Sequence, residues 1–175
     1  KNAKLSVVGS NNIEKSFAIT KSLILSIVQE LSKKCSREAG GYVHWGGTTR
    51  NIIDTGRNLL VREAHRNILK NLSISIKKLS DLSIKYSETP MLGRTMGQNA
   101  VPISFGFKVA GWIESLIRLD SKFKHAEASI FTLLFGGAVG AMHGFNGKGY
   151  ELTQQLASNL GFNNSIVPNR TSLET

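Results

Sequence analysis

Three stretches of the chain place apolar residues three and four positions apart, which is the spacing of one face of an α-helix. The first covers residues 13–35, the second residues 50–86, and the third begins near residue 102 or 103 and runs to about residue 123. Because an α-helix turns once in 3.6 residues, this spacing predicts three amphipathic helices. A helix as long as the second needs other long helices to cover its apolar face, so it indicates a bundle.

Glycines mark the ends of the predicted helices. Gly40 and Gly41 follow the first helix, and Gly161 follows a shorter helix predicted over residues 150–160. Residues 135–149 are rich in glycine and small side chains, which permits close backbone packing or a bend that faces a ligand. The sequence shows no strand alternation and no convincing repeat, and residues 162–175 are expected to be irregular. The predicted fold class is therefore all-α, with long antiparallel helices in a bundle.

Two segments rich in glycine and polar residues interrupt the helical pattern. Residues 42–56 read YVHWGGTTRNIIDTG, and residues 89–106 read TPMLGRTMGQNAVPISFG. In the second segment the prolines stiffen the chain, the glycines let backbone approach a ligand, and polar side chains supply donors and acceptors. Helix connections also collect proline and glycine simply because helices must end. Composition alone leaves a functional loop and a plain connection both open.

The charge of the chain bears on its partners. Its 175 residues carry a formal net charge of +10, which would attract nucleic acid, phosphorylated substrates or acidic membrane surfaces. The cations are scattered as on solvated helix faces, without the aromatic-interleaved basic stripe of an RNA-binding surface. This distribution argues against nucleic acid as the partner. Strongly salt-dependent binding to polyanions would be the sign of that alternative.

Other features bear on location and on metals. Cys35 is the only cysteine, so no disulfide can form within the chain, and a reducing, cytoplasmic location is expected. No apolar run reaches membrane-spanning length, and no signal-peptide core is present, so no membrane association is expected. No metal constellation and no cofactor motif is apparent. The first residue is Lys rather than Met, which indicates processing or sequence missing upstream.

Taken together, the two polar segments resemble the fumarase/aspartase superfamily. The resemblance is greatest to its adenylosuccinate lyase and carboxymuconate cycloisomerase branch, whose members carry Y-x-H-W-G-A-T-S/T-x-D-I-x-D-T and then T-P-M-x-G-R-T-H-x-Q-x-A-x-P-x-T-F-G. It extends from about residue 18 to the neighbourhood of residue 168, through FGFKVAGWIESLIR and FGGAVGAM. It implies a helical bundle of this type, incomplete relative to the family. Residues 1–88 would end an N-terminal helical region and enter the first long helix, and residues 89–175 would carry the substrate loop and further helices, within one continuous structural unit.

The resemblance implies a site that removes a proton next to a carboxylate and stabilises the resulting anion. His44 matches a family histidine that contacts substrate or orients the acid partner, although a histidine beside a tryptophan is also an ordinary packing residue. Thr48 and Thr49 match a pair that binds a substrate carboxylate, and they also suit a helix cap. Asn51, where this branch usually has Asp, is interpreted as substrate-side polarity, and Asp54 as a support for the helix start.

In the second segment Arg94, Thr95 and Gln98 match the family's substrate-binding pattern, whereas Met96 replaces a histidine used in proton transfer or substrate positioning. A thioether cannot titrate and scarcely forms hydrogen bonds. Ser22 stands near a second position where relatives place histidine. VPNRTSLET, from residue 167, lacks the histidine and the Arg-Asp pair of V-P-W-H-T-x-R-D, and the family's mobile serine loop has no counterpart in these residues. His125 and His143 have no family counterpart and are expected to be surface or packing residues, and His65 on the second predicted helix is expected to be solvated.

Two functions follow from the resemblance and its departures. The first is the helical core of a homotetrameric lyase or cycloisomerase that performs β-elimination or cycloisomerisation on a carboxylate or phosphorylated small molecule. Its sites would combine loops from three subunits. The alternative is a non-catalytic helical assembly, or a pseudoenzyme that binds small anions after the loss of the histidines. Turnover separates the two, because the alternative predicts assembly without reaction.

Overall fold

The computed structural model describes residues 3–167 and divides the chain into two compact units. The first unit comprises Lys1–Leu59 together with Phe131–Thr175, and the second comprises Leu60–Ile130. Helices form most of both units, and the described residues contain a single two-stranded sheet. The prediction of a mainly helical fold is confirmed. No helix within residues 3–167 is long and apolar enough to cross a membrane.

The first unit opens with four helices, α1 (Leu5–Val8), α2 (Ser10–Thr20), α3 (Leu23–Lys34) and α4 (Arg37–Gly41). The prediction of one continuous helix over residues 13–35 is wrong, because Lys21 takes a left-handed conformation with φ of 54°. Ser22 then starts α3, and its hydroxyl accepts a hydrogen bond from the backbone N–H of Leu25 at 3.4 Å. Serine favours this capping position because its side chain satisfies a backbone donor that the helix itself leaves unpaired.

The hydrophobic core of the first unit surrounds an extended segment in which alternate side chains point inward. The buried side chains are those of Phe131, Leu133, Phe135, Ala157 and Phe162. The segment is tied to the chain after α7 (Gly149–Leu160), because Leu133 N–H donates to the Asn163 carbonyl at 2.8 Å. The predicted end of α7 is confirmed, since Gly161 follows it with φ of 64°. Period-two burial here is strand-like, which corrects the expectation that the sequence carries no strand alternation.

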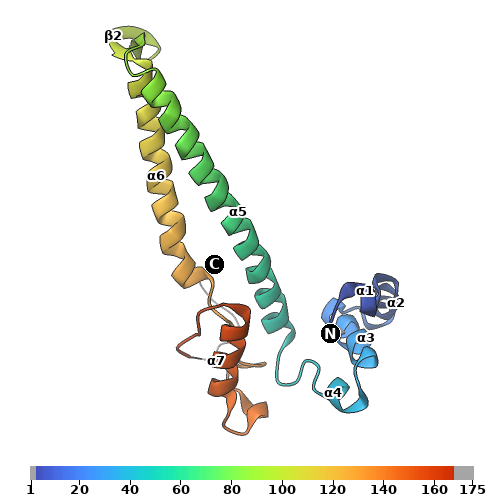
Figure 1. Cartoon of the computed structure of the whole chain (residues 1–175). Helices are drawn as coiled ribbons and strands as arrows, with labels where there is room; N and C mark the ends of the chain where they lie inside the picture. Colours follow the sequence, from blue (N-terminus) through green and yellow to red (C-terminus); the bar gives the residue numbers. More distant parts are fainter. Residues whose placement is uncertain (1–2, 168–175) are drawn as a thin grey trace. The chain divides into compact units, whose positions relative to one another are not determined.

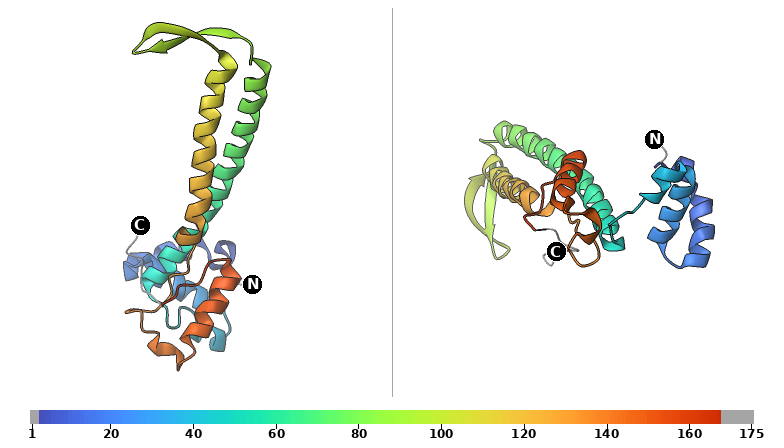
Figure 2. Two further views of the ribbon diagram at one scale, coloured as in Figure 1. Left: turned by 90° about the vertical axis from the view of Figure 1, so that its left-hand side faces the viewer. Right: turned by 90° about the horizontal axis from the view of Figure 1, so that it is seen from below.

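The second unit contains α6 (Phe105–Ile130) and, from Leu60 onward, α5 (Thr49–Lys85), whose first residues belong to the first unit. Within the second unit the two helices run side by side in opposite directions (Figures 1 and 2). The prediction of a helix over residues 50–86 is confirmed. His65 is wrongly predicted as solvated: it is 7% exposed, and its Nε2 lies 2.8 Å from Glu127 Oε1. The His65 ring also lies 5.5 Å from that of Phe123. His65 therefore belongs to the contact between α5 and α6.

A close backbone approach joins α5 and α6 near the end of the pair that carries the sheet. A Cβ on Gly106 would lie 2.4 Å from the Ser83 carbonyl oxygen, so only glycine fits this position without a shift. The Ser83 hydroxyl donates to the Gly106 carbonyl at 2.8 Å, and Gly106 N–H donates to the Tyr86 carbonyl at 2.9 Å. These bonds fix the start of α6 against the last turns of α5.

The polar segment between α5 and α6 forms a β-hairpin of β1 (Pro90–Thr95) and β2 (Gln98–Ser104). The predictions of a loop without strands here and of a helix that starts near residue 102 or 103 are therefore wrong. Pro102 lies in β2 opposite Leu92, and α6 begins at Phe105. Both strands of a two-stranded sheet are edge strands, so a proline without an N–H is tolerated.

Candidate functional site

The first polar segment forms a tight loop between α4 and α5. The N–H of Trp45 donates to the Tyr42 carbonyl at 3.1 Å, and the N–H of Gly47 donates to the His44 carbonyl at 3.3 Å. His44 has φ of 67° and Gly46 has φ of 66°. Positive φ is uncommon for residues other than glycine, although histidine is among those that tolerate it. The half-buried His44 side chain is therefore presented from a sharply turned backbone.

Close packing against the glycine-rich segment holds this loop in place. A Cβ on Gly46 would lie 2.0 Å from Cζ of Phe145, which belongs to the short 3₁₀ helix η1 (His143–Phe145). The indole Nε1 of Trp45 donates to the Gly144 carbonyl at 3.2 Å. Of the two roles predicted for residues 135–149, close backbone packing is thus confirmed. His143 itself is exposed, as predicted.

The threonine pair lies where the loop enters α5. Thr48 is half-buried and precedes the helix, and its carbonyl accepts the N–H of Ile52 at 3.3 Å. Thr49 is the first residue of α5 and is exposed. Backbone N–H groups at a helix start lack partners within the helix and carry partial positive charge. The pair thus lies at a position suited to a carboxylate.

Asn51 and Asp54 lie on the first turns of α5, on its buried side. Asn51 is 1% exposed; its Oδ1 accepts from Thr48 N–H at 3.1 Å and from Gly137 N–H at 3.2 Å. Its Nδ2 donates to the Leu134 carbonyl at 3.0 Å. Asp54 is 6% exposed and pairs with Arg50 at 2.9 Å, so it supports the helix start as predicted. The structure does not test whether Asn51 contacts substrate, so that role stays a prediction.

The second group of predicted site residues lies on the hairpin of the other unit. Thr95 pairs with Gln98 across the turn formed by Met96 and Gly97, which have φ of 50° and 77°. Two central residues with positive φ are typical of the turn that best matches the twist of a hairpin. Arg94, Thr95 and Gln98 are all exposed, and Met96 is fully exposed at the tip. Their side chains are available to a ligand or a partner.

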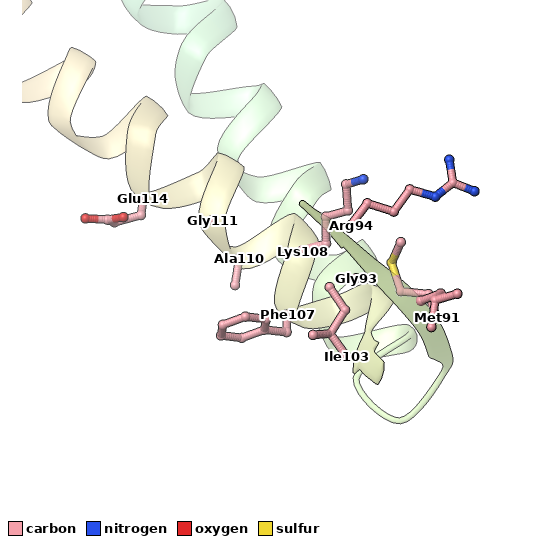
Figure 3. Close-up of a pocket in the computed structure, with 10 residues that line it drawn as sticks. Met91, Gly93, Arg94, Ile103, Phe107, Lys108, Ala110, Gly111 and Glu114 are labelled. Carbon is pink, nitrogen blue, oxygen red and sulfur yellow. The ribbon is translucent and has the colours of Figure 1, made fainter. Parts of the chain in front are cut away.

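An open groove of about 860 Å³ runs between the hairpin and the first turns of α6 (Figure 3). Ile103 and Phe107 contribute apolar surface, and Arg94, Lys108 and Glu114 contribute charge. Arg94 is the predicted site residue that lines this groove. The groove thus combines two cations and one carboxylate with apolar walls.

The two polar segments belong to different units. His44, Thr48, Thr49 and Asn51 lie in the first unit, and residues 94–98 lie in the second. Neither unit by itself contains both groups of predicted site residues. At the altered positions the structure places Ser22 at the start of α3 and Met96 at the hairpin tip. The departures over residues 169–174 lie outside the described residues.

Two further observations concern metals and the remaining histidine. Within residues 3–167 no group of three histidine, cysteine or carboxylate side chains is arranged to hold a metal ion. His125 is exposed on α6, as predicted.

The contact that the sequence does not reveal is the one between Asn51 and the backbone of residues 134–137. The sequence gives a partial indication of it, because the F-x-L-x-F alternation of residues 131–135 is typical of a strand. The backbone N–H and carbonyl groups of such a segment can bond with other parts of the chain.

The chain matches proteins of known activity over most of its length. A family model described as "Lyase" matches residues 6–175. The N-acetyl-S-(2-succino)cysteine lyase of Enterococcus italicus is 33% identical over 151 residues, which are 86% of this chain and 33% of that protein. The adenylosuccinate lyase of Methanocaldococcus jannaschii is 30% identical over 155 residues, again 86% of this chain and 33% of that protein.

Solved structures agree with these sequence matches. The 3-carboxy-cis,cis-muconate lactonizing enzyme of Pseudomonas putida superimposes with a TM-score of 0.84 at 29% identity, covering 91% of this chain and 37% of that one. A fumarate lyase of Mesorhizobium also gives a TM-score of 0.84, at 30% identity, covering 90% and 37%. The chain thus spans about a third of the length of its relatives. It belongs to the lyase family of the fumarase/aspartase superfamily.

Proposed function

We propose that this protein is a lyase or cycloisomerase that acts on a small carboxylate substrate, by β-elimination or by cycloisomerisation. The observation that carries the proposal is the placement of the two family motifs. One puts a threonine pair at the start of a 37-residue helix, and the other puts Thr95 and Gln98 beside a hairpin turn. At both places hydrogen-bond donors can reach an anion while the helix and the hairpin stay folded.

The proposed roles follow from the chemistry of each side chain. Thr48 and Thr49 bind a substrate carboxylate at the start of α5, with Asn51 as a polar neighbour of that site. Arg94, Thr95 and Gln98 bind a second anionic or polar part of the substrate. His44 is the candidate for proton handling or for substrate contact, because imidazole can donate and accept near neutral pH. No metal or cofactor enters these roles.

A homotetramer is part of this proposal. The predicted site residues are divided between two units, and the second unit exposes large apolar side chains that another copy of the chain would cover. These include Leu60 at 71%, Val101 at 69% and Phe107 at 70% exposure. Sedimentation of the purified protein tests the assembly, and a strictly monomeric species at micromolar concentration contradicts it. A cytoplasmic location stays a prediction that rests on the lone Cys35.

The reaction is tested by offering a panel of substrates to the full polypeptide. The panel contains adenylosuccinate, argininosuccinate, N-acetyl-S-(2-succino)cysteine, 3-carboxy-cis,cis-muconate and malate. Formation of fumarate, or of the lactone in the case of muconate, is followed by ultraviolet absorbance and chromatography. We expect turnover of at least one substrate and its loss in Thr48→Val. Absence of turnover with the whole panel would count against a lyase.

One observation favours the second candidate function, a pseudoenzyme that binds small anions. Met96 occupies the position of a family histidine at the tip of the hairpin, and its thioether cannot transfer a proton. General acid or base help contributes roughly 10² to 10⁴ in rate. The Met96→His variant separates the two candidates. A rate that rises by at least tenfold indicates a nearly intact catalytic site, whereas fumarate binding without turnover in both proteins indicates the pseudoenzyme.

A further inference from the structure

Asn51 is the most completely buried polar side chain at the predicted carboxylate-binding loop. It is 1% exposed, and its amide is bonded to three backbone groups: Thr48 N–H, Gly137 N–H and the Leu134 carbonyl. Thr48 belongs to the loop, whereas the other two belong to the segment that follows α6. Leu134 and Gly137 lie 83 and 86 positions from Asn51 in the sequence, whereas Thr48 lies only three positions away. A single side chain thus joins two distant parts of the first unit.

We propose that Asn51 is a positioning residue, which fixes the Thr48–Thr49 corner to residues 134–137. In this role it acts on the substrate through Thr48 rather than by direct contact. The inference deepens the proposed function and rests on it for the identity of the ligand. It makes the conformation of the binding loop a property of the first unit, set before any substrate or partner arrives.

The chemistry of the amide suits this role better than that of a carboxylate. Oδ1 faces two N–H donors and Nδ2 faces one carbonyl acceptor, so each amide atom meets a group of opposite polarity. A carboxylate would accept the same two N–H groups, but its second oxygen would face the Leu134 carbonyl without a proton between them. Burial makes such an unmatched pair costly. This explains why an amide stands here in place of the Asp expected from the resemblance.

The segment on the far side of Asn51 is itself firmly held. Leu133 is 1% exposed, and its N–H donates to the Asn163 carbonyl at 2.8 Å. Phe135 lies in the hydrophobic core of the unit. Gly137 has φ of 77°, and a Cβ there would lie 3.0 Å from the Gly46 carbonyl oxygen. Asn51 therefore connects the loop to packed backbone, and its bonds restrain the loop.

The experiment compares the wild type with Asn51→Leu and Asn51→Asp, with Asn71→Leu as the matched control. Asn71 is exposed on the same helix, so its replacement changes the residue type without removing a buried clamp. Two quantities are measured: amide hydrogen exchange at Thr48 and Gly137, and the Kd of fumarate as the probe ligand by calorimetry. Circular dichroism checks that each variant is folded.

We expect both amides to be protected in the wild type and in Asn71→Leu. Asn51→Leu should speed their exchange by about tenfold or more, the effect of one lost buried hydrogen bond, and should weaken fumarate binding by a similar factor. Asn51→Asp keeps both acceptors and should leave the two amides protected, while the protein unfolds at lower denaturant concentration.

Several results would overturn the inference. Rapid exchange of Thr48 or Gly137 in the wild type would show that the clamp does not form, and this measurement needs no variant to fold. Loss of protection in Asn51→Leu with fumarate affinity unchanged within twofold would show a structural bond without a positioning role. Failure of fumarate to bind the wild type counts against the proposed function instead, and the exchange data then decide the clamp by themselves.

Discussion

Gly46 offers the sharpest test of how the first loop is held. A Cβ at this position would lie 2.0 Å from Cζ of Phe145 and 2.6 and 2.7 Å from the two neighbouring ring carbons. Real Cβ atoms do not approach so closely, so Gly46→Ala must displace either the loop or the ring. The ring cannot retreat freely, because that of Phe135 lies against it with centroids 6.0 Å apart. The backbone adds strain, since φ is 66°.

The expected loss of stability has two parts. A left-handed conformation costs a residue with a Cβ roughly 1–2 kcal/mol, and overpacking costs about 1–3 kcal/mol. Gly46→Ala should therefore lower the free energy of unfolding by about 2–5 kcal/mol. For a chain of this size 1 kcal/mol moves the melting temperature by about 2–4 °C. Gly97→Ala is the matched control, because its φ is 77° but no atom lies within 4 Å of the added Cβ.

Urea unfolding followed by circular dichroism measures the loss, and a double-mutant cycle identifies its source. When Phe145→Ala removes the ring, Gly46→Ala should retain only the backbone part, about 1–2 kcal/mol. The coupling between the two substitutions is then about 1–3 kcal/mol. If Gly46→Ala costs the same with and without the ring, or no more than Gly97→Ala, the close packing of the loop on Phe145 is refuted.

Three smaller changes test other contacts. His65→Ala should lower the free energy of unfolding by roughly 1–2 kcal/mol in a urea titration, since the packing of the buried ring and its hydrogen bond to the half-exposed Glu127 are lost. A change below about 0.5 kcal/mol would contradict that contact. Ser22→Ala should cost about 0.5–1 kcal/mol, the low end for a helix cap because the bond is 3.4 Å long, whereas Ser22→Gly should cost only a few tenths. Met96→His should change the free energy of unfolding, measured by thermal melting, by less than about 0.5 kcal/mol, because the site is fully exposed and histidine tolerates positive φ. A larger loss would contradict the hairpin turn.

The long helices were predictable because their signal is local. The apolar spacing of residues 50–86 matches α5 within a residue at each end, and Gly161 ends α7 as expected. The break between α2 and α3 was also marked, since a serine before an apolar run is a typical helix start. The resemblance presents Ser22 only as a replaced histidine, and the apolar pattern that continues past it conceals the cap.

The apolar pattern of the sequence does not reveal contacts between segments that lie far apart along the chain. His65 stands seven residues before the buried Leu72, on the same side of α5, but the sequence does not mark its partners Glu127 and Phe123, some 60 residues away. The hairpin lacks the Asn-Gly or Asp-Gly turn that signals one, because Met96 occupies the first position of its turn. Asn51 was identified as a polar site residue, but its three backbone partners become apparent only once the core of the first unit has formed.

Because the predicted site is divided between two units, the conformation of the first loop and the assembly of the whole site can be disturbed separately. The first loop is fixed by Gly46, Trp45 and Asn51 through contacts that all lie within the first unit. Thr95 and Gln98 depend instead on the register of the hairpin, which is set within the second unit. Damage to the Asn51 clamp should therefore weaken ligand binding while leaving the oligomeric state unchanged. Damage to the exposed apolar faces of α5 and α6 should do the reverse, reducing assembly first and activity only as a consequence.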